Sequence, residues 1–169
     1  MGGEAAGSRR GREPKSLHER ALGLLAVRAR SRVELRRRLL SAGFPADEVD
    51  AEVATLASVG LLDDEAFARA AVEEATGRRL QGRRAVVASL SARGVDRAVI
   101  ERALEEGAGD EAERAAALAR ARVTRLAGLA PDVAARRLSD LLMRRGYAPA
   151  IARRAAAAAL AVDPDPDDA

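Results

Sequence analysis

Arginine carries nearly all of the positive charge in this sequence and is its most promising residue type for chemistry. Only Lys15 among the 29 basic residues is a lysine, and 26 acidic residues bring the formal net charge to +3. A guanidinium group binds phosphate or carboxylate through two parallel hydrogen bonds. The arginines gather in separate stretches, and we expect the following to contact an anionic partner: Arg32, Arg36, Arg37, Arg83, Arg84, Arg136, Arg137, Arg144 and Arg145. The alternative is a solvated surface of ion pairs, because acidic segments lie between these stretches.

Side chains suited to metal binding or nucleophilic catalysis are scarce. The chain has no cysteine and a single histidine, His18, which excludes zinc clusters and thiolate chemistry. No glycine-rich phosphate-binding loop is present. The acidic cluster Asp63-Asp64-Glu65 suggests Mg²⁺, but we favour a helix N-terminus, where the helix dipole stabilises acids. We therefore expect no enzyme activity, no metal and no cofactor.

The composition favours helices and excludes a sheet. Hydrophobic residues make up 48% of the chain, much of it alanine, and aromatic residues only 2%. Alanine is the best helix former and lets helices approach closely, whereas sheets need β-branched and aromatic residues. No stretch approaches the roughly 20 apolar residues that cross a bilayer. The N-terminal residues lack the apolar core of a secretory signal, so we expect a cytoplasmic protein without a membrane segment.

Helix start and stop signals are clearest near the first arginine stretch. Ser31 and Glu34 have the spacing of a capping box, in which the two side chains satisfy each other's backbone N–H groups. The predicted helix carries Leu35 and Leu39 on one face and ends at Gly43, a residue typical of helix C-termini.

Two more helices are predicted after this one. Pro45 suits the start of the next helix, and Gly60 its end. Asp63 or Asp64 caps the helix that follows, which carries Phe67 on its inner face.

The first helical pattern returns twice along the chain. The helix-ending glycines Gly43, Gly94 and Gly146 lie 51 and 52 residues apart. Apolar residues recur eight and four residues before each glycine and directly after it: Leu35, Val86 and Leu138; Leu39, Leu90 and Leu142; Phe44, Val95 and Tyr147. The segment Asp64-Glu65-Ala66 also reappears as Asp110-Glu111-Ala112. A three-helix unit this small cannot bury its apolar stripe alone, so we expect the copies to stack in a line.

These patterns divide the chain into five segments. We expect a disordered basic tail over residues 1–16, a first unit over 17–78, a second over 79–128, a third over 129–162, and an acidic, proline-containing tail over 163–169. The predicted fold is all-α: an elongated tandem array of three-helix, helix-turn-helix-like repeats.

Two motifs in combination resemble those of a known family. The segment Arg28-x-Arg30-Ser31-x-x-Glu34-Leu35-x-x-x-Leu39-x-x-x-Gly43-Phe44, followed by Gly60-Leu61-Leu62-Asp63-Asp64-x-x-Phe67-Ala68, resembles the RecX regulatory proteins of bacteria. Three later segments fit that family's second and third repeats: Leu90-x-x-x-Gly94-Val95, Arg136-Arg137-Leu138, and Leu142-x-x-x-Gly146-Tyr147. The resemblance extends from about Leu17 to Leu160.

The resemblance implies a modulator of the RecA recombinase. Such proteins lie in the groove of the RecA–DNA filament and hinder its growth, its ATP hydrolysis, strand exchange, and the coprotease activity that triggers the SOS response. We accordingly expect a monomer that binds the RecA nucleoprotein filament through the arginines above, and that also contacts single- or double-stranded DNA in one version of this hypothesis. The sequence departs from the family at Ala71, Glu73 and Glu74, where an aromatic and then a basic residue are common. If the helix that carries these residues touches the filament, its contacts must therefore differ or be weaker.

Two other functions stay open on the sequence alone. One is direct, sequence-nonspecific DNA binding, which would show a steep dependence on salt. Stacking on unpaired bases is disfavoured, because the only aromatic residues are Phe44, Phe67 and Tyr147. The other is a structural helical-repeat adaptor.

Overall fold

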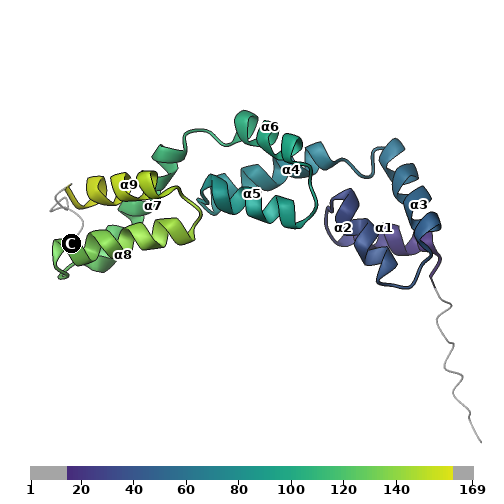
Figure 1. Ribbon diagram of the computed structural model, residues 1–169, viewed down its shortest axis with the longest axis horizontal. Coiled ribbons are helices and arrows are strands. Elements are labelled where there is room, and N and C mark those ends of the chain that lie inside the picture. The colour runs from purple at the N-terminus through teal and green to yellow at the C-terminus, as the bar shows by residue number, and fades with distance from the viewer. Residues whose placement is uncertain (1–14, 162–169) are drawn as a thin grey trace, which may run out of the picture.

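The computed structural model describes residues 15–161, which fold into helices joined by short loops (Figure 1). In chain order these are α1 (Leu17–Val27), α2 (Arg32–Leu40), α3 (Ala46–Ser58), α4 (Asp64–Glu73), the π-helical turn η1 (Glu74–Arg78), α5 (Arg83–Ala92), α6 (Arg97–Gly107), α7 (Glu111–Val123), the 3₁₀ turn η2 (Thr124–Leu126), α8 (Pro131–Arg144) and α9 (Pro149–Ala161). The predicted all-α, elongated repeat fold is confirmed. Over this range no helix combines the length and the apolar character that crossing a bilayer requires. The predicted tails lie outside the described residues, apart from Lys15 and Ser16.

The helices form three groups of three along one extended molecule, and each group has its own core (Figure 1). In the first group Leu35 and Leu39 of α2 are buried together with Val49 and Leu56 of α3. The copies stack in a line as expected, but each group buries most of its apolar stripe within its own three helices, which was not expected. Alanines let the three helices of a group come close enough to cover the apolar stripe themselves.

The packing groups the helices differently from the predicted units, which ended at residues 78 and 128. Phe67 and Val72 of α4 lie in the same core as Val86 of α5 and Ile100 of α6. The groups are thus α1–α3, α4–α6 and α7–α9, and the arginine-rich helix is the middle one of each.

The three glycines of the repeat end α2, α5 and α8 as predicted. All three have left-handed backbone conformations, with φ of +91° at Gly43, +78° at Gly94 and +92° at Gly146. The six apolar residues eight and four positions before them are at most 2% exposed. Val95 and Tyr147 are buried as well, whereas Phe44 is only half-buried.

The predicted capping box at the start of α2 is half right. The Ser31 hydroxyl accepts a hydrogen bond from the Glu34 backbone N–H at 3.0 Å. The Glu34 carboxylate, however, accepts hydrogen bonds from Arg28 and Arg30 instead of the Ser31 backbone, because two guanidinium groups reach it. A complete capping box stands at the start of α1, between Ser16 and Glu19.

The acidic residues before α4 and α7 are helix caps. The Asp63 carboxylate accepts hydrogen bonds from the N–H groups of the second and third helical residues of α4. Asp110 caps α7 in the same way. Asp63 and Asp110 are therefore the equivalent residues, one position away from the predicted alignment of Asp64 with Asp110.

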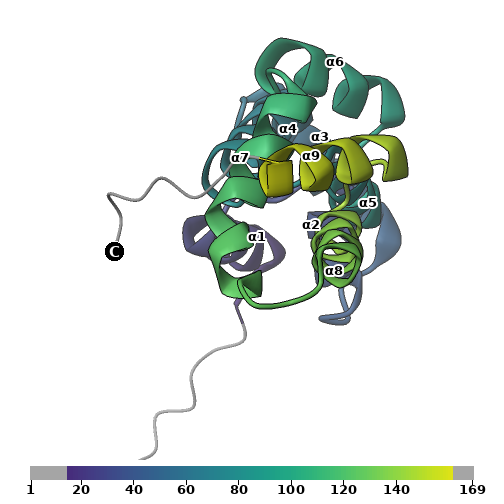
Figure 2. The same ribbon diagram turned by 90° about the vertical axis from the view of Figure 1, so that its left-hand side faces the viewer.

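The middle helices α2, α5 and α8 lie end to end along the molecule (Figure 1), and Figure 2, viewed from one end, shows them in one row. Donors at the start of α5 meet carbonyl groups at the end of α8: Gly82 N–H donates to Arg145 O at 2.9 Å, and Arg84 N–H to Gly146 O at 3.1 Å. At the other junction the Ser31 hydroxyl donates to the Arg93 carbonyl. The positive end of one helix dipole thus meets the negative end of the next, which is favourable.

Glycine is required at these junctions because the helix ends touch. A Cβ atom at Gly146 would lie 2.4 Å from the Ala85 Cβ, and one at Gly94 would lie 2.4 Å from the Val33 Cβ. Gly43 ends the row, and a Cβ there would meet nothing within 4 Å. At the opposite end of the row, α8 begins one helical turn earlier, relative to its glycine, than α2 and α5 do.

Comparison of two glycine substitutions tests this junction. Gly43→Ala should cost about 1–2 kcal/mol, the price of a left-handed conformation for a residue with a Cβ. Gly146→Ala adds a clash with Ala85 and should cost roughly 2 kcal/mol more. Urea unfolding followed by circular dichroism measures both losses, and equal losses would contradict the close approach of α8 to α5.

Candidate partner-binding surface

The middle helices carry the arginines predicted to bind a partner, and the structure brings these side chains into one row. Arg145 is half-buried, and the others are exposed: Arg32, Arg36, Arg37, Arg83, Arg84, Arg136, Arg137 and Arg144. They fall into two sets, because some of these guanidinium groups are engaged within the protein.

Arg36 and Arg83 hold neighbouring helices. The Arg36 guanidinium binds the Asp50 carboxylate of α3 through two hydrogen bonds, at 2.5 and 3.1 Å. The hydrogen bond from Arg36 keeps the pKa of Asp50 below its ordinary value. Arg83 forms an ion pair with Glu101 of α6. Asp50 and Glu101 lie 51 residues apart, so equivalent carboxylates of the third helix pair with the middle helix in two groups, although the two arginines lie at different positions of their helices.

Arg145 belongs to the junction between the second and third groups. Its guanidinium donates to the Arg79 carbonyl at 3.0 Å. Tyr147 acts beside it, because its hydroxyl donates to the Leu80 carbonyl at 2.8 Å. Leu80 has a left-handed φ of +46°, and this hydrogen bond helps to hold that conformation.

Arg37, Arg84 and Arg136 face away from the cores. Each lies two residues from the buried apolar residue of its helix, which is about 200° around the helix axis. Among the described residues none of the three forms an ion pair. The three middle helices of the row thus each present at least one outward guanidinium that is unpaired among the described residues.

Glu34 forms an ionic network with Arg28 and Arg30 near the start of α2, in which Glu34 and Arg30 are buried and Arg28 is exposed. The Glu34 side chain is 4% exposed and accepts hydrogen bonds from both guanidinium groups, at 2.5 Å from Arg30. Burial alone would raise the pKa of Glu34, but the hydrogen bonds from Arg28 and Arg30 keep it below its ordinary value. Arg30 also donates to the Leu24 carbonyl, so the network joins α2 to the end of α1.

The acidic cluster at residues 63–65 is occupied by protein groups. Asp63 caps α4, and hydrogen bonds from backbone N–H groups, chiefly that of Ala66, lower its pKa. Asp64 accepts a hydrogen bond from the Arg32 N–H at 2.9 Å, and Glu65 pairs with Arg102 at 3.1 Å. Within the described residues no three candidate metal ligands come together.

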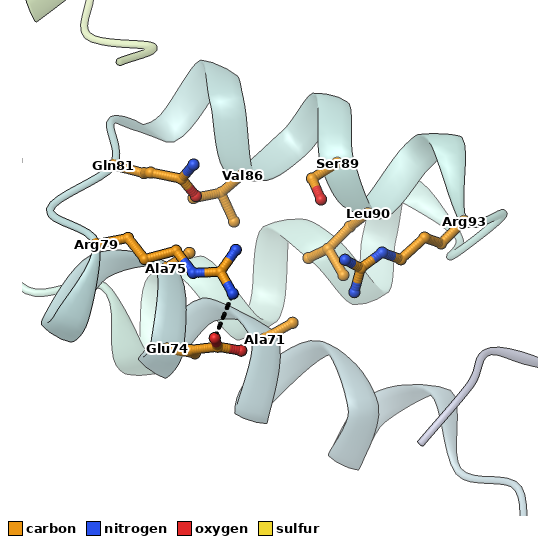
Figure 3. Close-up of a pocket in the computed structure, with 9 residues that line it drawn as sticks. All are labelled: Ala71, Glu74, Ala75, Arg79, Gln81, Val86, Ser89, Leu90 and Arg93. Carbon is orange, nitrogen blue, oxygen red and sulfur yellow. Dashed lines mark hydrogen bonds and ion pairs between the residues drawn. The ribbon is translucent and has the colours of Figure 1, made fainter. Parts of the chain in front are cut away.

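A small pocket between η1 and α5 was not predicted from the sequence (Figure 3). Arg79 and Glu74 form an ion pair on one side of it at 2.5 Å. Opposite, the half-buried Arg93 guanidinium lies 5.7 Å from the centre of the Phe67 ring. Ala71 and Glu74, two of the departures from the family pattern, line this pocket. No sequence signal marks the π-helical turn that shapes it.

Three helix triplets in a row, with an outward arginine on each middle helix, define an all-helical repeat protein with exposed basic residues along its middle helices. Two family models match the chain: RecX, first three-helix domain, over residues 18–56, and RecX, second three-helix domain, over residues 63–104. These ranges fall on α1–α3 and α4–α6. The regulatory protein RecX of Mycobacterium avium (strain 104) is 41% identical over 145 residues, which is 84% of this chain and 83% of the relative. The chain belongs to the RecX family.

Other relatives agree with this assignment. The regulatory protein RecX of Mycolicibacterium vanbaalenii is 40% identical over 147 residues, covering 83% of this chain and 78% of the relative. The crystal structure of RecX from Lactobacillus salivarius superposes with a TM-score of 0.75 at 20% identity, covering 86% of this chain and 96% of that one. The resemblance inferred from the sequence motifs is confirmed.

The ionic network predicts a specific acid sensitivity. Because the folded-state pKa of Glu34 is depressed, its contribution to stability is present above its unfolded pKa and is lost as the pH falls through the folded value. Glu34→Gln should lower the free energy of unfolding by about 3 kcal/mol near neutral pH. It should also reduce the further loss of stability as the pH falls below the ordinary glutamate pKa of 4.5.

Urea unfolding at a series of pH values measures this difference. Glu105→Gln removes an exposed carboxylate and serves as the control, with the pH profile of the parent protein. Parallel pH profiles for Glu34→Gln and the parent protein would contradict the role of the network.

Proposed function

We propose that this protein binds the RecA recombinase filament and inhibits its recombinase, ATPase and coprotease activities, so modulating DNA repair and the SOS response. Membership of the RecX family supports a regulatory role rather than an enzymatic one. The observation that carries the proposal is the row of outward arginines on α2, α5 and α8. A cytoplasmic site of action and a monomeric protein are part of the same proposal.

The arrangement suits a partner that is itself a repeating polymer. Separate groups along the protein each present an outward guanidinium group, so several weak contacts to successive protomers act together. Each contact is exposed and therefore contributes little binding free energy, so the affinity depends on the number of contacts. The outward arginines Arg37, Arg84 and Arg136 are our first candidates. Arg32, Arg137 and Arg144 are the next, because they are exposed and form no ion pair among the described residues.

The ATPase activity of RecA on single-stranded DNA tests the proposal when this protein is titrated into the reaction. The triple variant Arg37→Gln, Arg84→Gln, Arg136→Gln should inhibit roughly 10- to 100-fold less effectively, if each lost contact is worth about 0.5–1 kcal/mol. The control replaces Arg20, Arg97 and Arg125 by Gln, since these are exposed, lie outside the row and change the charge equally.

The control variant should inhibit as the parent protein does. If both triple variants inhibited the RecA ATPase equally less well than the parent protein, the effect would be one of net charge alone. Absence of inhibition by the parent protein at excess concentration would refute the proposed function itself.

Direct, sequence-nonspecific DNA binding is the second candidate, favoured by the same exposed arginines. It predicts binding to bare DNA with an affinity that falls steeply as salt increases. Fluorescence anisotropy of a labelled duplex and a labelled single strand at several salt concentrations measures this. Negligible affinity near physiological salt, together with binding to RecA filaments, would exclude it. A pull-down from cell extract that lacked RecA would favour a structural adaptor instead.

A further inference from the structure

A groove of about 400 Å³ lies between α8 and α9, the last two helices. Ala135, Met143 and Ala157 give it an apolar lining, and Met143 is 38% exposed there. Arg136 and Arg153 line the same groove, one from each helix. Among the described residues neither guanidinium forms an ion pair, although Asp140 also lines the groove.

The charge of this part of the molecule is strongly one-sided. Helices α8 and α9 and the loop between them contain six arginines and only two aspartates, Asp132 and Asp140. The apolar lining and unpaired guanidinium groups together suit an extended segment that alternates acidic and apolar residues.

The chain itself contains such a segment directly after α9. Residues 162–169 read Val-Asp-Pro-Asp-Pro-Asp-Asp-Ala, with four aspartates and two prolines. Proline disfavours a helix and favours an extended backbone. Acidic and apolar residues alternate along the sequence Asp163-Pro164-Asp165-Pro166.

We propose that residues 162–169 occupy the groove between α8 and α9 and compete there with the anionic partner. The reach is sufficient: along α9, Ala157 lies about 6 Å and Arg153 about 12 Å before Ala161. Eight extended residues span about 26 Å. The aspartates meet Arg136 and Arg153, and the prolines lie on the alanine and methionine lining.

Occupancy of the groove by the tail does not depend on the proposed function. Only its regulatory consequence rests on that function. Arg136 is the outward arginine of the third group, so a bound tail covers the third contact of the row. The tail then acts as a built-in competitor that a stronger anionic surface must displace.

A spin label tests the occupancy without reference to RecA. The chain has no cysteine, so Ala169→Cys accepts a single nitroxide. We expect paramagnetic broadening of backbone amide signals near residues 135–143 and 153–157. In the matched variant with Asp163, Asp165, Asp167 and Asp168 replaced by Asn, this broadening should be lost. Broadening elsewhere, or unchanged broadening in the Asn variant, would overturn the proposal.

A mixed sample distinguishes the tail of the same molecule from that of a second copy. Isotope-labelled protein without the nitroxide is combined with unlabelled protein that carries it. Broadening in this mixture equal to that in the singly labelled sample would overturn the proposal in favour of a second copy. No broadening in the mixture supports it.

Binding of a fluorescein-labelled oligothymidylate measures the competition. The four-Asn variant should bind this probe at least about threefold more tightly than the parent protein at low salt. In the background of Arg136→Gln and Arg153→Gln the four-Asn change should have a clearly smaller effect, because the groove no longer attracts the tail. An equal gain in affinity for the oligothymidylate in both backgrounds would show that the tail acts only through net charge, and would overturn the proposal. If RecA were not inhibited while the broadening pattern was found, the proposed function would fail and the tail site would stand.

Discussion

The contact between successive middle helices is the constraint on which the rest of the structure depends. Each group of three helices has its own core, and few apolar residues cross from one group to the next, such as Leu80, which packs against the core of the third group. The end of α8 meets the start of α5 through backbone hydrogen bonds, and the end of α5 meets the start of α2 at Ser31. This approach is possible only because Gly146 and Gly94 lack a Cβ atom where the helices touch. The straightness of the arginine row follows from these junctions.

Polar side chains around the junctions form hydrogen bonds within the protein, and these engage several of its charged residues. Asp64 of α4 accepts a hydrogen bond from the start of α2, and Glu111 of α7 accepts one from the start of α5, at 2.8 Å. The first turn of each following group thus caps the middle helix of the preceding group. Arg145 and Tyr147 complete the second junction through the loop before α5. Charge in this protein therefore has two structural settings: some guanidinium groups lie in junctions and ion pairs, and others lie outside them.

Much of the fold could be predicted from the sequence, because the glycine-ended helices repeat at a nearly constant spacing and bury the same positions. The division of the helices into groups could not be predicted, because by its sequence pattern the apolar face of α4 could pack against either the preceding or the following helices. The carboxylate of Glu34 has the spacing of a capping box, yet Arg28 and Arg30 reach it from outside that pattern. Arg36 and Arg83 form ion pairs whereas Arg37 and Arg84 do not. This difference likewise depends on carboxylates of the third helices, which lie outside the local sequence pattern. Residue type predicted a basic face, and only geometry shows which members are uncommitted.

The early start of α8 has a consequence for self-association. The end of α2 at Gly43 is open. A helix end of this kind is one of the two partners in each junction between groups. If the start of α8 matched that of α2 or α5, a second molecule could dock its Gly43 end there, and head-to-tail addition would continue without closing into a ring. The additional turn that begins at Pro131 occupies that place. The third group therefore ends the row with a helix start unlike those of α2 and α5, as terminal repeats commonly differ from internal ones.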